Sequence, residues 1–440
     1  MPAIRRSGRG VRSLLLVGGA LVFVAASTLA GAYAFSRWRL RVEERAWAAA
    51  GLPFDALRQR WPAADHSAGA RTLDELARPL GVRLIPGAGD EGQNENGPLF
   101  TALNKAMGDL ATQDGACDQL PPEAVRFLDA HRAEVSAVAA HLRSGAGITW
   151  RIDLEAGYMA PVPALLAQRH LGTLLVAEAL ERSRRGDAAG ADQMLEAAGQ
   201  QADALDGRPD LISGLIAVSL FGLQEAALRC LPEPSPAWEA RLEQRLQRSP
   251  LVDRLRAEAY GALSLVRQNR GVADLDDFGT FDRAPGARVF RLLTAPYVRL
   301  CVAGMSRHTR RARELGMATD RCRISSEQTE QAVVGGIPRW DFLSRVAVPG
   351  LARASWTGTA ADLETEMTRL VLQTRRRAGT GAPAPGAPTG VPSTACTGVT
   401  WRQDGLPGGR WIVHAVPPPA AIPWHAGKKA WEYTFATRHP

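Results

Sequence analysis

Lysine is almost absent from this 440-residue chain, because only three of its 53 basic residues are lysine and the others are arginine. Four of these arginines, Arg5, Arg6, Arg9 and Arg12, precede the first apolar segment, and no acidic residue accompanies them. From Arg37 onward, 49 basic residues stand against 45 acidic ones. The strong positive field that nucleic-acid binding needs is therefore missing, and we expect no nucleic-acid partner.

The sequence also lacks the common catalytic motifs. It contains no HExxH, no GxSxG, no P-loop and no GxGxxG after a strand, so it does not indicate a metalloprotease, an α/β-hydrolase, an NTPase or a dinucleotide enzyme. A lone histidine is more often a packing or surface residue than a catalyst. We expect no cofactor and no metal site from the dispersed histidines His66, His170, His308, His414 and His425.

Cysteine is scarce, and no pair of cysteines has the CxxC spacing of a zinc site. In an oxidising compartment one or two disulfides would form and leave one thiol over, but the sequence leaves the pairing open. The alternative is that the cysteines are isolated core residues. The five are Cys117, Cys230, Cys301, Cys322 and Cys396.

A long apolar segment lies near the N-terminus. Leu14–Phe35 is a run of 22 residues without charge, and as a helix it would reach about 33 Å, close to the thickness of a hydrocarbon core. Arginines flank both ends, with a slight bias that favours a cytoplasmic N-terminus. Trp38 would lie at the far interface. The sequence predicts a single-pass anchor in the inner (cytoplasmic) membrane, with the body periplasmic or extracellular.

The alternative interpretation of this segment is a secretory signal cleaved near Ala34, because Ala32-Tyr33-Ala34 has the small-x-small pattern of a cleavage site. The run is longer than the usual apolar core of a signal, which favours a retained anchor. Ser27 and Gly31 have a small-xxx-small spacing, which allows a homodimer through this helix or arises by chance in an Ala-rich segment.

Hydrophobic residues make up 45% of the chain and charged residues 22%, as in globular proteins. The periodicity predicts a mainly α fold, with an irregular helical-hairpin body, an N-terminal transmembrane helix and a small C-terminal β segment. We expect five parts: 1–36, the cytoplasmic tail and anchor; 37–158, a membrane-proximal helical region with a short strand; 159–378, a helical-hairpin core; 379–395, a Pro/Gly/Ala linker; and 396–440, a strand-rich end.

The hairpin core contains the clearest local signals. Gly186 and Asp187 supply a helix-ending glycine and an N-cap between two apolar helices, and Pro209-Asp210 begins a third. The run LGTLLVAEALERSRRGDAAGADQML has this order, and residues 160–230 resemble tetratricopeptide-type helical hairpins. The wider layout is similar to that of single-pass membrane-anchored helical proteins of bacteria. Neither resemblance implies an activity. A further helix is expected from Pro121 to Leu142.

The C-terminal end is rich in tryptophan. Short strands are predicted at 398–401, 410–416 and 431–436, after helices that end near Arg377 and the linker. These tryptophans either pack a small sheet on the helical body, which we favour, or bind sugar or peptide from an exposed face. The four are Trp401, Trp411, Trp424 and Trp431.

Three acidic residues are candidates for catalysis. Ile148–Leu154 alternates strictly between apolar and polar residues and predicts a strand, on which Asp153 and Glu155 lie about 7 Å apart. A solvated strand face explains the pair equally well. Glu258 lies on an otherwise apolar helix, where an ion pair with Arg254 is the structural alternative.

The sequence favours a membrane-anchored extracytoplasmic scaffold, or protein-binding module, of the bacterial envelope, without catalysis and with a protein partner. The alternative is an extracytoplasmic hydrolase whose site combines Asp153, Glu155, Glu258 or the histidines. These side chains would have to converge in one cleft for the alternative to hold.

Overall fold

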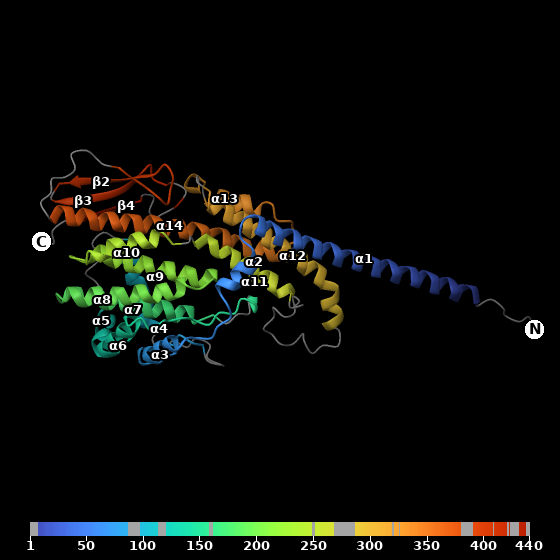
Figure 1. The fold of residues 1–440 in the computed structure, drawn as a ribbon, viewed down its shortest axis with the longest axis horizontal. Helices are drawn as coiled ribbons and strands as arrows, with labels where there is room; N and C mark the ends of the chain where they lie inside the picture. Colours follow the sequence, from blue (N-terminus) through green and yellow to red (C-terminus); the bar gives the residue numbers. More distant parts are fainter. Residues whose placement is uncertain are drawn as a thin grey trace, which may run out of the picture.

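The computed structural model describes residues 8–86, 97–112, 120–157, 162–248, 251–267, 287–318, 321–324, 326–379, 390–407, 409–419, 422 and 431–436. Over these residues the chain forms fourteen α-helices and one four-stranded sheet, which confirms the predicted fold class. Figure 1 shows an elongated body from which the N-terminal helix projects at one end, while the sheet lies at the other.

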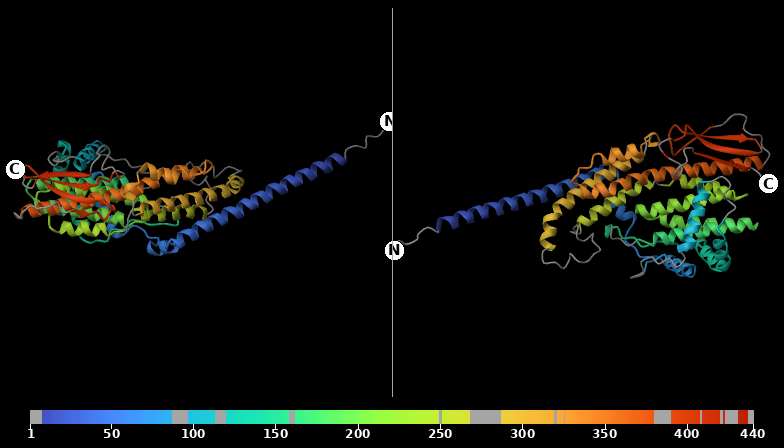
Figure 2. Two further views of the ribbon diagram at one scale, coloured as in Figure 1. Left: turned by 90° about the horizontal axis from the view of Figure 1, so that it is seen from above. Right: turned by 180° about the vertical axis from the view of Figure 1, so that it is seen from behind.

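The first helix, α1, has two different halves. It runs from Gly8 to Ala49, about 63 Å, and the part from Leu16 is long and apolar enough to cross a membrane. Large side chains such as Phe23 are 72% exposed, whereas Ser36 and Trp47 are fully buried. Both views of Figure 2 show the first half projecting clear of the body. The second half is therefore part of the body, packed on a later helix, α12 (Ala287–Gly316).

Five helices follow α1; the last four form one side of the main core, whereas the first packs in a second core with the end of α1 and with α11 (Leu255–Arg267). The predicted single helix from Pro121 to Leu142 is wrong, because the backbone leaves the helical region at His131 (φ −114°, ψ 24°) and a new helix begins at the next residue. The His131 ring packs on Phe127 at this break, with 4.4 Å between ring centroids. The five helices are α2 (Phe54–Arg60), α3 (Ala68–Ala77), α4 (Gly97–Thr112), α5 (Pro122–Ala130) and α6 (Arg132–Arg143).

The predicted strand at Ile148–Leu154 is also wrong. The alternation of burial is present, since Trp150 and Ile152 are buried, but the segment makes one isolated bridge, between Ile152 and Ala64. A strand needs a partner of matching length, and the facing chain turns into α3 after Ser67. The segment is therefore an extended connection held against the core by its apolar side.

The helical-hairpin core is built as its local signals predict. The helices α7 (Leu165–Arg184), α8 (Ala188–Asp206) and α9 (Leu211–Cys230) pack on one another. Gly186 adopts φ +81°, which favours glycine, and the Asp187 carboxylate accepts the Gly190 N–H at 2.8 Å. These two residues end one helix and begin the next, so the turn is set by adjacent side chains.

The remaining helices connect this core to both ends of the molecule. A 3₁₀ turn (Leu251–Arg254) precedes α11, and α14 contacts α9, α10, α12 and α13. Figure 1 shows α14 running along the body toward the sheet. The helices are α10 (Ala237–Leu246), α11 (Leu255–Arg267), α12 (Ala287–Gly316), α13 (Ser326–Val334) and α14 (Phe342–Gly379).

The sheet is antiparallel with strands in chain order, β1 (Val391–Pro392), β2 (Thr400–Leu406), β3 (Arg410–Val416) and β4 (Glu432–Ala436). One face packs on apolar residues of α14. Trp401 and Trp431 are 1% and 2% exposed, so the packing interpretation is confirmed for both. Trp424 lies outside the described residues.

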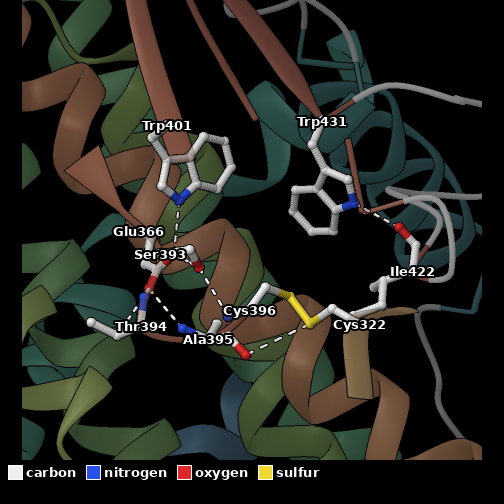
Figure 3. The surroundings of a disulfide bond; sticks show 9 residues. All are labelled: Cys322, Glu366, Ser393, Thr394, Ala395, Cys396, Trp401, Ile422 and Trp431. Atoms are coloured by element: carbon white, nitrogen blue, oxygen red, sulfur yellow. Dashed lines mark hydrogen bonds between the residues drawn. A yellow bond between two sulfur atoms is a disulfide. The ribbon is translucent and has the colours of Figure 1, made fainter. Parts of the chain in front are cut away.

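A buried carboxylate and a disulfide fasten the sheet to the helices (Figure 3). Glu366 of α14 is 3% exposed and accepts the Trp401 indole N–H at 2.7 Å. It also accepts hydrogen bonds from the hydroxyls of residues 393 and 394 and from the backbone N–H groups of residues 394 and 395. The next residue, Cys396, forms a disulfide with Cys322. These hydrogen bonds and the disulfide add to the apolar packing between α14 and the sheet.

Among the described cysteines, three are in disulfides and one is a free thiol. Cys230 is also disulfide-bonded, while Cys301 is free and buried. Cys117 lies outside the described residues. Disulfides persist in oxidising compartments.

Candidate functional site

The three predicted acidic residues are held by different partners. Asp153 accepts the backbone N–H of Ala156 at 3.1 Å, which is a local turn contact. Glu155 accepts the Tyr260 hydroxyl, and burial together with this carboxylate raises the pKa of Tyr260 to about 12. Arg58 approaches the same Glu155 oxygen at 3.5 Å. The two contacts of Glu155 tie this connection to α11 and α2, which is a structural role.

Glu258 of α11 lies at the N-terminus of α9. Its Oε1 accepts the backbone N–H of Leu211, the first residue of α9, at 2.9 Å. Burial raises the pKa of Glu258 to about 7, and the nearby Asp210 carboxylate adds to the effect. The expected neighbour Arg254 binds Asp206 instead, with 2.6 Å between nitrogen and oxygen.

The histidines are spread over the body. His170 stacks on Phe100 with centroids 4.1 Å apart, and burial lowers its pKa to about 4. Burial also lowers the pKa of His66 and of His308. His414 lies on β3, 3.4 Å from Asp404 of β2. His425 lies outside the described residues.

A different group of residues lines the larger of two adjoining hollows, which we call the outer hollow. It measures about 300 Å³ and lies between α2, the connection from α8 to α9, and the start of α11. Trp61 closes one side, because its indole N–H donates to the Gly207 carbonyl at 2.9 Å. Its lining is Leu52, Leu57, Arg60, Trp61, Asp206, Arg208, Pro209, Arg248, Asp253, Arg254, Arg256 and Ala257. Five arginines therefore face two aspartates.

Both aspartates of the outer hollow are already paired. Asp206 binds Arg254 and also lies 3.6 Å from Arg248. Asp253 binds Arg313, which comes from α12 and does not line the hollow. The negative charge in the lining is thus neutralised by these partners.

Arg60 and Arg256 form no ion pair within the described part of the chain. The Arg60 guanidinium lies 4.4 Å from the centroid of the Trp61 ring, and Arg256 donates to the Pro53 carbonyl at 3.1 Å. Burial lowers the pKa of Arg256, and the positive charge of Arg60 lowers it further. Arg60 is exposed and Arg256 is half-buried, and two like charges on the lining of one hollow attract an anion.

An inner hollow adjoins the outer one, and the two share Asp206 and Arg248. It measures about 60 Å³, so it has room for only about two waters. Glu225 lines it, accepting Arg245 at 2.6 Å and the Thr365 hydroxyl at 2.8 Å. Burial raises the pKa of Glu225 to about 7, and the neighbouring Glu364 carboxylate contributes.

Sequence reasoning missed both hollows for a physical reason. Arg60 and Arg256 are nearly 200 positions apart, and each stands in a helix whose other arginines form ordinary ion pairs. Arg60 and Arg256 are two of 50 arginines, so nothing in the neighbouring sequence marks them as part of a site. Glu225 carried a weak one, since it is an acid inside the apolar helix that Pro209-Asp210 begins.

No protein-family model, curated protein or solved structure matches this chain closely enough to indicate a relative.

Proposed function

We propose that this chain is a membrane-anchored binding protein of the bacterial envelope, which holds an acidic segment of a protein partner in its outer hollow and catalyses no reaction. The observation that supports this most directly is the pair Arg60 and Arg256, neither of which forms an ion pair among the described residues, although the Asp253 carboxylate acts on Arg256. Guanidinium groups bind carboxylates in bidentate geometry, and an acidic segment would relieve the repulsion between the pair.

The location that we propose rests on α1 and on the cysteines. The exposed first half of α1 suits a single-pass anchor in the cytoplasmic membrane, and the disulfides suit a body outside the cytoplasm. Ala49 lies 14 residues beyond Phe35, or about 21 Å along the helix, and α2 follows directly. The outer hollow would then face partners a short distance above the membrane.

Binding is tested with the full-length chain in lipid nanodiscs and a fluorescent hexaglutamate peptide, by anisotropy at low and moderate salt. Each charge-assisted hydrogen bond contributes about 1.5 to 3 kcal/mol, so we expect Arg60→Gln and Arg256→Gln each to weaken binding about tenfold or more. Arg58→Gln is the matched control, because Arg58 lies on the same helix but is already paired with Asp55. Equal affinity of the peptide for the wild type and all three variants, or no binding to the wild type, would refute the proposal.

Compartment is tested separately by fusing a reporter after Pro440 that is active only outside the cytoplasm. Activity of the fusion supports the proposed topology, and activity of a cytosol-only reporter contradicts it. The mass of the mature chain distinguishes a retained anchor from cleavage near Ala34.

A hydrolase is the second candidate, and the raised pKa of Glu225 is the observation that favours it, since perturbed carboxyls often act as general acids. The size of the inner hollow opposes it, because about 60 Å³ cannot admit a substrate. Glu225→Gln would abolish any hydrolysis that the wild type shows toward a panel of ester and glycoside substrates. If the wild type hydrolyses none of these substrates and Glu225→Gln only lowers stability, the hydrolase is refuted and the binding function stands as proposed.

A further inference from the structure

Four large apolar side chains stand exposed on the first turns of α12. Val289, Phe290, Leu292 and Leu293 are 51–59% exposed, although all lie within five residues of one another. A soluble body rarely shows so dense an apolar group, and such groups mark contact surfaces. We call these four residues the apolar segment; Arg291 stands between Phe290 and Leu292 in the sequence.

A proline and a tyrosine hold the apolar segment beside α1. Pro296 has no backbone N–H, so the Leu292 carbonyl four residues earlier loses its helical donor. The Tyr33 hydroxyl of α1 donates to this carbonyl at 2.7 Å. Arg299 adds a second contact, with its guanidinium 4.9 Å from the centroid of the Tyr33 ring. Figure 1 shows the first turns of α12 bending away from α1 at the end of the body nearest the projecting half.

These contacts fix the height of the apolar segment along α1. Tyr33 lies two residues before Phe35, the end of the uncharged run. The hydrogen bond therefore places Leu292 at the last turn of the part of α1 that is apolar enough to span a bilayer. Exposed apolar side chains at that height face lipid, if the run is in a membrane.

Aromatic residues gather one turn above. Two hydrogen bonds join α1 to α12, from Tyr33 to Leu292 and from Trp47 to Ser306. In both, the partners are 259 positions apart in the sequence, so the two helices run parallel with a constant offset. The same offset places Tyr297 level with Trp38, which is 53% exposed. Tyr297 donates to the carbonyl of Trp340, itself 52% exposed, at 2.7 Å. Tryptophan and tyrosine are typical of the membrane–water interface.

Exposed arginines complete the pattern. Arg37 and Arg41 of α1 and Arg339 and Arg345 near the start of α14 are exposed or half-buried, close in sequence to these aromatics. Basic side chains at the headgroup level favour anionic lipid. Aromatic and basic residues thus occur together beyond the apolar run of α1, as at a bilayer surface.

We propose that the apolar segment dips into the lipid interface beside the anchor as a second membrane contact, which fixes the orientation and height of the body. This inference rests on the proposed membrane anchor. One helix alone would let the body rotate and tilt, whereas a second contact holds the outer hollow at a constant height.

The test uses the full-length chain in vesicles of phosphatidylethanolamine and phosphatidylglycerol. Single cysteines carrying an NBD fluorophore replace Leu293 in the apolar segment, Val22 in the middle of the span, and Leu406, an exposed residue of β2. All three side chains are exposed, so folding is expected to be unaffected. The chain without an added cysteine controls for labelling of the buried Cys301.

We expect lipid-borne nitroxide to quench the labels at Leu293 and Val22, with loss of iodide quenching, and iodide alone to quench the label at Leu406. A label at Leu293 that behaves like that at Leu406, while Val22 stays protected, overturns the inference and leaves the anchor intact. A label at Val22 that is open to iodide overturns the anchor. Shielding of Leu293 from both quenchers would indicate a second copy of the chain on this face and would also overturn the inference.

Discussion

The most apolar stretches of α1 and α9 have nearly the same mean hydropathy, and both helices are long enough to cross a membrane. They differ in what covers these stretches. None of the residues in the apolar stretch of α1 is buried, whereas 67% of those in α9 are. Helix α9 (Leu211–Cys230) packs against α7, α8 and α14, whereas the first half of α1 projects and the helix is hydrogen-bonded to the start of α12 from Tyr33, in its second half. Hydropathy alone therefore does not separate an anchor from a core helix, but neighbours do.

The largest expected effect comes from placing a charge in each helix. Leu220 of α9 is 2% exposed and touches the space over Gly172, so Leu220→Arg buries an unpaired charge and should cost about 4 kcal/mol or more. Leu21 of α1 is 65% exposed, and Leu21→Arg should leave the unfolding temperature of the body unchanged. It should instead oppose membrane insertion by roughly 2.5 to 3.5 kcal/mol.

Thermal unfolding in detergent and the membrane-bound fraction in cells measure the two outcomes. A drop in unfolding temperature with Leu21→Arg as large as with Leu220→Arg would mean that the first half of α1 packs on the body.

The next effect concerns the buried arginine near the end of α9, since the apolar run of α1 carries no charged side chain. Arg229 is 1% exposed and binds Glu364 of α14 at 2.9 Å and the Thr368 hydroxyl at 2.6 Å. Removing one partner leaves a buried charge, so Arg229→Met and Glu364→Met should each cost about 3 to 5 kcal/mol. The double variant should recover most of that loss, because apolar side chains often replace a buried pair without penalty.

Denaturant titrations of the four chains give this coupling energy directly. Additive losses in the double variant would show that the two residues act independently.

The third effect is a pH dependence at the start of α9. Glu258 has a pKa of about 7 in the folded chain, well above that of an unfolded glutamate, because burial disfavours its charged form more than the hydrogen bond from the Leu211 N–H favours it. Between these two pKa values the folded chain binds more protons than the unfolded one, so stability falls as the pH rises toward 7. Glu258→Gln should raise stability at pH 8 by up to about 3 kcal/mol and change little at pH 4.

Unfolding titrations at both pH values measure this gain, with the exposed Glu123→Gln as the control. A stability profile that stays as steep in the Glu258→Gln variant would place the titrating group elsewhere.

The sequence predicted those features that adjacent residues determine. Gly186 and Asp187 end and begin helices through contacts with residues a few positions away, so their roles were visible in the sequence. The strand at Ile148–Leu154 was predicted from an alternation that is real, but its pairing depends on a distant chain segment around Ala64. Local pattern cannot show that such a partner is too short.

The candidate site was beyond prediction for a related reason. The outer hollow joins Arg60 to Arg256 by packing α2 on α11, and the partners that neutralise Asp206 and Asp253 come from still other elements. Which arginine is left unpaired depends on all of these contacts together. Glu366 was missed likewise, since its hydrogen-bond donors arrive with the sheet.

The smallest expected effect tests whether adjacent residues determine where α8 begins in the hairpin core, whereas the apolar run of α1 is defined by its composition. Asp187→Ala removes the cap of α8 and should cost about 1 kcal/mol, since the Gly190 N–H loses its acceptor. Asp187→Asn keeps an acceptor oxygen in place and should cost clearly less. The ion pair of Asp187 with Arg182 is 3.7 Å long and half exposed, so its loss in both variants matters little. Equal destabilisation by Ala and Asn would assign the effect to charge rather than to capping, and denaturant unfolding of the two variants distinguishes these outcomes.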